Sequence, residues 1–178
     1  MRRMDSKLKR APGVYLTGFM GSGKSTVARI LADRLGWDFI DLDAEIESAE
    51  QTTIAEIFEG RGETEFRRIE HETLRKVVRR IECGVPAVIA LGGGSFVQPA
   101  ITELLEQNGI SIWLDCSFET IAQRVVDPDS RPLARDPQKF RNLYEERRVA
   151  YSRASYRINA DCEVESAVDS ILGLPCWK

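Results

Sequence analysis

A glycine-rich run near the start of the chain separates two segments of different periodicity. Residues from Gly18 to Thr26 read Gly-Phe-Met-Gly-Ser-Gly-Lys-Ser-Thr. Residues 14–17 form a short, β-rich apolar run, whereas residues 24–35 carry apolar side chains at helical spacing. Glycines let backbone N–H groups curl around an anion, and the N-terminus of the following helix points its positive end at the same place. The run therefore predicts a strand, a phosphate-binding loop and a helix.

The alternation of strand and helix continues along the whole chain. Short apolar runs predict four further strands, at 38–43, 86–91, 109–115 and 156–159. Helical spacing covers 53–82, 98–107, 117–126, 138–151 and 163–172. Gly60 and Gly62 predict a joint that divides the longest helical segment in two. This pattern indicates an α/β fold of three layers, α/β/α, with a central five-stranded parallel sheet and ligands at the carboxyl ends of the strands.

Size and charge limit the possible functions. With 178 residues and 43% hydrophobic content, the chain suits one domain, and its net charge of −3 gives no general attraction to nucleic acid. The basic residues 1–12 lack the apolar core of a signal peptide, and no later run is long enough to span a membrane. We therefore expect a cytoplasmic protein with a flexible segment at 1–12 and a single domain at 13–178. The polar, proline-rich stretch at 127–137 predicts a mobile loop.

Gly18, Gly23, Lys24 and Ser25 have the spacing of a Walker A motif. In such a loop, Lys24 reaches the β and γ phosphates of a nucleotide, and the Ser25 hydroxyl binds Mg²⁺. A chance match in a Gly/Ser-rich turn is the alternative, but here the motif follows a predicted strand and opens a predicted helix. The candidate nucleotide-binding residues are Gly21, Ser22, Gly23, Lys24, Ser25 and Thr26.

Further motifs occur in an order that resembles the shikimate kinase family. They are Asp-Leu-Asp at 41–43, Ile-x-x-Ile-Phe at 54–58, Gly-Glu at 62–63, Phe-Arg-x-x-Glu at 66–70, Gly-Gly-Gly at 92–94, Arg-Pro-Leu at 131–133 and Arg-x-x-x-Tyr at 147–151. The resemblance runs from about residue 13 to 172. It implies a P-loop kinase fold with a mobile lid, and a monomeric enzyme. The implied reaction transfers the γ-phosphoryl group of ATP to the 3-hydroxyl of shikimate, in aromatic amino-acid biosynthesis.

The resemblance gives roles to the two aspartates at 41–43. It implies that Asp43 binds the acceptor hydroxyls, where it could orient the 3-hydroxyl and accept its proton, and that Asp41 lies near Mg²⁺ through water. Because phosphoryl transfer depends mainly on positioning and electrostatics, the contribution of a base could be small. The alternative is that these carboxylates form a solvated turn or a helix cap before Ala44.

Two arginines match the family's ligands for the carboxylate of shikimate. Arg67 and Arg147 occupy these positions, and a guanidinium group suits the role because its fixed, fork-shaped donors match carboxylate geometry. Each has an arginine beside it, Arg68 and Arg148, and the alternative for every one of them is an ordinary surface ion pair.

The family also assigns the glycines after the third strand and the lid. The N–H of Gly93 would donate to the substrate, with a simple tight turn as the alternative. Residues 127–137 resemble the lid that closes over ATP, and Arg131 would reach the phosphates. Arg124 matches a basic residue that contacts nucleotide in some relatives, and a solvated helix arginine is its alternative. We count Lys24, Asp43 and Arg131 as catalytic candidates.

Other functions stay open at this point. A gluconate kinase would share the phosphate loop and the sheet, although it should lack the Phe-Arg-x-x-Glu and Gly-Gly-Gly motifs. A non-catalytic nucleotide sensor or a GTPase-like switch would belong to a different class, but the chain has no Asn-Lys-x-Asp guanine signature. The adenine contacts stay open, and residues 174–178 receive no role.

Overall fold

The computed structural model describes residues 13–125 and 136–177. The expected flexible segment at 1–12 and most of the expected lid, including Arg131, lie outside the described residues.

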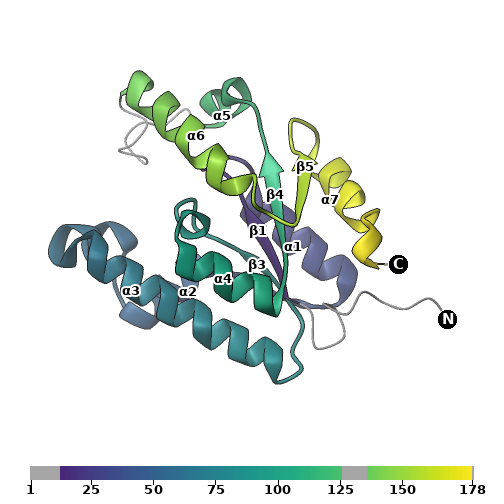
Figure 1. Cartoon of the computed structure of the whole chain (residues 1–178), viewed down its shortest axis with the longest axis horizontal. Coiled ribbons are helices and arrows are strands. Elements are labelled where there is room, and N and C mark those ends of the chain that lie inside the picture. The colour runs from purple at the N-terminus through teal and green to yellow at the C-terminus, as the bar shows by residue number, and fades with distance from the viewer. Residues whose placement is uncertain (1–12, 126–135, 178) are drawn as a thin grey trace.

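A parallel sheet of five strands forms the centre of the molecule, as predicted (Figure 1). The strands lie in the order β2-β3-β1-β4-β5, and all neighbouring pairs are parallel. Both β1 and β3 are buried along their whole length, which explains their continuous apolar sequences. Their bounds are β1 (Gly13–Thr17), β2 (Asp38–Asp41), β3 (Ala87–Ala90), β4 (Gly109–Asp115) and β5 (Tyr156–Asn159).

Helices cover both faces of this sheet and confirm the three-layer architecture. On one face α1 packs against α7, and the other face carries α3, α4 and α6 (Figure 1). The helices are α1 (Lys24–Leu35), α2 (Leu42–Glu50), α3 (Ile54–Glu82), α4 (Pro99–Asn108), α5 (Phe118–Arg124), α6 (Pro137–Tyr151) and α7 (Val164–Leu172), with 3₁₀ turns at Ser95–Val97 and Pro175–Trp177.

The second strand is shorter than its sequence predicts. The prediction of a strand over 38–43 is wrong at the carboxyl end of that range, because β2 ends at Asp41 and α2 begins at the next residue. The Asp41 carboxylate accepts hydrogen bonds from the backbone N–H groups of Asp43 and Ala44, at 3.1 and 3.3 Å, and so caps the helix. Asp43 therefore lies in the first turn of a helix rather than at a strand end.

The long helix α3 contains the predicted glycine joint. Gly62 has φ 79° and ψ 170°, a non-helical conformation that kinks the helix and confirms two segments at this place. The N-terminus of α3 is fixed by a capping box, in which the Thr53 side chain accepts from the Glu56 N–H and the Glu56 side chain accepts from the Thr53 N–H. The second segment carries Arg67 toward the carboxyl edge of the sheet.

The C-terminal residues, for which the motifs predict no role, pack beside the start of β2. The Trp177 and Trp37 rings lie 5.7 Å apart, and the Trp177 indole N–H donates to the Ile171 carbonyl at 2.6 Å. Cys176 is buried beside them. In the described part of the chain, no helix combines the length and apolar character that a membrane span requires.

Candidate active site

A cavity of about 410 Å³ opens at the carboxyl ends of β1, β2 and β3. It lies where parallel sheets usually bind ligands, at the edge formed by the loops that follow the strands. Most of the sequence-predicted nucleotide and metal residues lie in its wall. The lining residues are Met20, Gly21, Gly23, Lys24, Ser25, Thr26, Asp41, Asp43, Leu91 and Gly93.

The glycine loop after β1 wraps the base of this cavity. Gly23 has φ 87°, a left-handed conformation that favours glycine, and it leads directly into α1. The Lys24 ammonium donates to the Gly18 and Phe19 carbonyls, at 2.9 Å each. Ser22 lies buried beneath the loop, and its backbone N–H donates to the Phe19 carbonyl at 3.2 Å. This arrangement presents an ammonium group and a helix N-terminus to the cavity.

Ser25 and Asp41 form a pair of oxygen donors in the same wall. The Ser25 hydroxyl donates to Asp41 Oδ2 at 2.6 Å, although the two residues come from different elements. Mg²⁺ in nucleotide sites typically takes one or two protein oxygens, with the remaining ligands from phosphates and water. No group of three or more His, Cys, Asp or Glu side chains within residues 13–125 and 136–177 could hold a metal ion alone. The donor set therefore fits Mg²⁺ that is bound together with a nucleotide.

Asp43 lies in the cavity wall between negative and positive neighbours. Burial, followed by the Asp41 and Glu70 carboxylates, raises the pKa of Asp43, the Lys24 ammonium opposes them, and the net result is a pKa of about 6. A carboxylate with this pKa is still mostly ionised at neutral pH, yet it binds a proton more readily than an ordinary aspartate. Asp43 can therefore accept a proton from a group in the cavity.

The three glycines after β3 bring the acceptor-side candidates together. A Cβ on Gly92 would lie 2.7 Å from Asp43 Oδ1, and one on Gly94 would lie 2.7 Å from Arg67 Nη2. At Gly93, the same atom would meet Arg147 Nη1 at 3.3 Å. The backbone of this loop is therefore the surface against which all three charged side chains pack.

The paired arginines on α3 have different surroundings. Arg67 Nη1 donates to Glu70 Oε2 at 2.8 Å, while its Nε and Nη2 approach Glu63 Oε1 at 3.3 and 3.2 Å. Arg68 points away and forms exposed ion pairs with Glu65 and Glu72. Arg68 therefore fits the surface-pair alternative alone. Arg67 also forms the helix ion pairs of that alternative, with Glu63 and Glu70, but in addition it faces the glycine loop.

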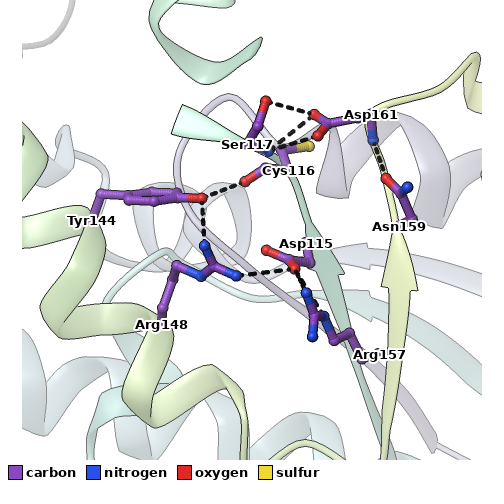
Figure 2. Close-up of polar contacts among 8 residues, drawn as sticks. All are labelled: Asp115, Cys116, Ser117, Tyr144, Arg148, Arg157, Asn159 and Asp161. Atoms are coloured by element: carbon purple, nitrogen blue, oxygen red, sulfur yellow. Dashed lines mark hydrogen bonds and ion pairs between the residues drawn. The ribbon is translucent and has the colours of Figure 1, made fainter. Parts of the chain in front are cut away.

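The pair on α6 divides in the same way. Arg147 lies beside Gly93, with its Cζ 5.7 Å from the centre of the Phe19 ring. Arg148 turns to the ends of β4 and β5, where it donates to Asp115 Oδ2 at 3.3 Å and to the Tyr144 hydroxyl at 3.2 Å (Figure 2). Arg148 therefore ties α6 to the sheet, and only Arg147 approaches the glycine loop.

Arg148 and its partners Asp115 and Tyr144, drawn in Figure 2, line part of a second cavity of about 480 Å³. Tyr144 donates from its hydroxyl to the Cys116 carbonyl at 2.7 Å, and Arg157 Nε donates to Asp115 Oδ2 at 2.8 Å. The Arg148 and Arg157 guanidinium groups thus share one carboxylate. These bonds hold α6 in place beside the sheet edge.

Of the two arginines predicted to contact the nucleotide, the structure describes Arg124 but not Arg131. Arg124 Nη1 lies 3.4 Å from the Gly21 carbonyl and 3.5 Å from Cys116 Sγ, so it contacts the phosphate loop from α5. Arg131 belongs to the part of the chain that the structure does not describe.

Two residues of this site received no role from the sequence. Glu70 is 1% exposed and accepts from Arg67, Ser95 and Gln98. Tyr151 is buried, and its hydroxyl donates to the Gly93 carbonyl at 2.5 Å. The motifs Phe-Arg-x-x-Glu and Arg-x-x-x-Tyr end on these two residues and were one signal. For Glu70, a carboxylate on the otherwise apolar stripe of α3 was a second signal, because buried acids require partners.

Comparisons with known proteins agree on one family. The model of the shikimate kinase family matches residues 20–173. A shikimate kinase of Sulfurihydrogenibium sp. is 40% identical over 156 residues, which cover 87% of this chain and 92% of that protein. The shikimate kinase of Ruegeria pomeroyi is 42% identical over 164 residues, covering 89% and 82%.

A solved structure agrees with these sequence matches. Shikimate kinase from Acinetobacter baumannii in complex with shikimate has a TM-score of 0.83 and 37% identity, and the match covers 90% of each chain. With its P-loop cavity and the arginines that meet at the loop after β3, this chain belongs to the shikimate kinase family.

Proposed function

We propose that this chain performs the reaction of its family with two sets of residues, one that lines the cavity and one that packs on the glycine loop beside it. It transfers the γ-phosphoryl group of ATP to the 3-hydroxyl of shikimate and releases ADP. The observation that carries the proposal is the convergence of Asp43, Arg67 and Arg147 on the loop from Gly92 to Gly94, beside the phosphate loop. An idle nucleotide sensor would not need this opposing half, and a gluconate kinase should lack the Phe-Arg-x-x-Glu and Gly-Gly-Gly motifs that build it.

On the donor side, the backbone N–H groups of the phosphate loop and the Lys24 ammonium bind the β and γ phosphates. Ser25 and Asp41 would hold Mg²⁺, Asp41 through water. When bound, the ion would neutralise charge on the transferring phosphoryl group. Arg124 adds a positive charge beside the loop, 3.4 Å from the Gly21 carbonyl. Arg131 would supply another from the lid.

On the acceptor side, Arg67 and Arg147 bind the carboxylate of shikimate, and the Gly93 N–H donates to the substrate. Asp43 orients the 3-hydroxyl and accepts its proton as the phosphoryl group transfers. This role is supported by its place in the cavity wall and by its pKa of about 6. Positioning by Asp43 also speeds the reaction, because a hydroxyl held in line with the γ-phosphate reacts without reorganisation.

The remaining proposals concern the protein in solution. The site lies within one described chain, so a monomer can form it, and we propose that the enzyme acts as a monomer in the cytoplasm. Size-exclusion chromatography with light scattering would test the first statement.

The acceptor is tested by measuring ADP release with different substrates. Purified protein with ATP and Mg²⁺ should release ADP rapidly only when shikimate is present. Gluconate, nucleoside monophosphates and water serve as the comparison acceptors. Equal rates with and without shikimate, or faster release with gluconate, would contradict the proposed function.

The metal role is tested with Asp41→Asn. Asparagine keeps an oxygen that can cap α2, so the free energy of unfolding should change by less than about 1 kcal/mol. Losing the charge should raise the Mg²⁺ concentration needed for half-maximal rate by about 5-fold or more. An unchanged Mg²⁺ dependence would show that Asp41 does not hold the ion.

A further inference from the structure

Glu70 connects α3 to the loop that carries the three glycines. Its carboxylate is buried and receives three donors: the Ser95 hydroxyl on Oε1 at 2.5 Å, and the Gln98 Nε2 and Arg67 Nη1 on Oε2 at 2.6 and 2.8 Å. Burying a carboxylate is costly unless such donors compensate for the lost water. Two of the three donors come from the segment directly after Gly94.

Arg67 has two edges with different surroundings. Its Nη1 donates inward to Glu70, which is 1% exposed. Its Nε and Nη2 lie together on the other edge and approach the Glu63 carboxylate, whose side chain is 68% exposed. The second edge is the fork that matches a carboxylate, and an exposed Glu63 can leave it when another carboxylate arrives.

We propose that Ser95 and Gln98 are positioning residues for the acceptor, and that they act through Glu70 on Arg67. By filling Oε1 and sharing Oε2, they hold Glu70 where it takes a single N–H group of Arg67. The Nε–Nη2 edge then stays available for the carboxylate of the substrate. The inference rests on the proposed function, in which Arg67 binds that carboxylate.

Removal of either donor has a defined consequence. A buried carboxylate that loses a donor turns toward the donors that are left, and Arg67 is one of them. Glu70 would then take a second N–H group from the guanidinium and draw the fork away from the glycine loop. The acceptor would lose affinity, while the phosphate loop, which these side chains do not touch, would keep its affinity for ATP.

Gln98 gives the sharper variant of the two. Its side chain does not cap α4, although it stands at the start of that helix, and it is only partly buried. Gln98→Met keeps the length of the side chain and removes the donor. Ser95→Ala removes the donor on Oε1, but Ser95 is fully buried, so its thermal unfolding must be compared with that of the wild type.

The test measures kcat and the KM values for shikimate and ATP. Gln98→Met and Ser95→Ala should each raise the KM for shikimate by about 10-fold, with the KM for ATP and kcat within about 2-fold of wild type. The matched controls are Gln138→Met, on the exposed face of α6, and Ser111→Ala, a buried serine that bonds Ser155. Neither control should change the KM for shikimate.

A double-mutant cycle with Arg67→Ala separates positioning from a general structural effect. If Gln98 acts through Arg67, Gln98→Met should lower kcat/KM for shikimate by about 10-fold alone and by less than 2-fold in the Arg67→Ala background. An equal loss in both backgrounds, or a parallel rise in the KM for ATP, would overturn the inference. If Arg67→Ala itself left kcat/KM unchanged, the proposed role of Arg67 would fail too, and the two failures are thus distinguishable.

Discussion

Residues that are neighbours in the sequence have different chemical surroundings in this site. Arg67 faces a buried glutamate and the glycine loop, whereas Arg68 forms exposed ion pairs. Asp41 accepts from the backbone and from Ser25, while burial and the neighbouring carboxylates raise the pKa of Asp43 to about 6. Reactivity at this scale depends on what each side chain touches, because residue type is the same within each pair.

Asp43→Asn should lower kcat while leaving ATP binding nearly unchanged. Asparagine keeps the shape of the side chain but cannot accept the proton of the acceptor hydroxyl, so we expect a loss of about 100-fold or more. The rate of the wild type should rise with pH through about 6 and then level, since the ionised form is the active one. A variant that no longer binds ATP would show that Asp43 acts elsewhere.

The same substitution should make the fold more stable at neutral pH. The pKa of Asp43 is raised from 3.8 to about 6, so between these values the folded state binds more protons than the unfolded state. Stability from this group is therefore complete below pH 3.8 and is lost as the pH rises through 6. At pH 7, Asp43→Asn should raise the free energy of unfolding by about 1–3 kcal/mol, and urea titrations at pH 7 and pH 4 would show whether the gain disappears in acid.

At the scale of elements, the loop after β3 sets the geometry of the acceptor side. Its three glycines leave no side chain between the backbone and Asp43, Arg67 and Arg147. This explains why consecutive glycines stand at the end of a buried strand, where a turn alone would not require them.

Gly94→Ala should disturb Arg67 without disturbing the fold. Gly94 has φ −103° and ψ −6°, which alanine can adopt, but its Cβ would lie 2.7 Å from Arg67 Nη2. Because the end of a long side chain can move, we expect a rise of about 10-fold in the KM for shikimate and a shift in Tm of only a few degrees. A large loss of Tm with an unchanged KM would mean that the glycine serves folding alone.

Most elements could be predicted from the sequence, and α2 shows where prediction fails. The apolar runs of β1 and β3 and the helical spacing of α1 point directly to buried strands and a covering helix. In α2 only Leu42 and Ile46 are buried, so its apolar stripe is too thin to suggest a helix. The capping aspartate Asp41, one of the alternatives for the Asp-Leu-Asp motif, is the local signal for its start.

At the scale of the whole molecule, the remaining surprises are contacts between distant segments. Glu70 meets Ser95 and Gln98 from another element, and Trp177 meets Trp37 across most of the chain. Neither contact has a signature in local periodicity, since each depends on how the elements assemble. Among the described residues, Lys24, Ser25, Asp41, Asp43 and Gly93 line one cavity, and Arg67 and Arg147 pack on the glycine loop beside it, because the parallel sheet brings its carboxyl ends together.

Trp177→Ala should destabilise the protein without changing its kinetics. The variant loses the packing on Trp37 and the hydrogen bond to the Ile171 carbonyl, which together should cost about 1–3 kcal/mol. For a chain of 178 residues this corresponds to a fall in Tm of about 2–12 °C. The KM for shikimate should stay within about 2-fold of wild type, and a marked change in it would contradict a purely structural role.

Arg67, and not its neighbour Arg68, is the residue that we propose binds the carboxylate of the acceptor. Measuring the KM for shikimate in Arg67→Ala and Arg68→Ala side by side, at saturating ATP, separates the two arginines. We expect a rise of about 100-fold or more for Arg67→Ala, because a charge-assisted fork is lost, and a change of less than 2-fold for Arg68→Ala. An unchanged KM in Arg67→Ala, or equal effects in both variants, would contradict it.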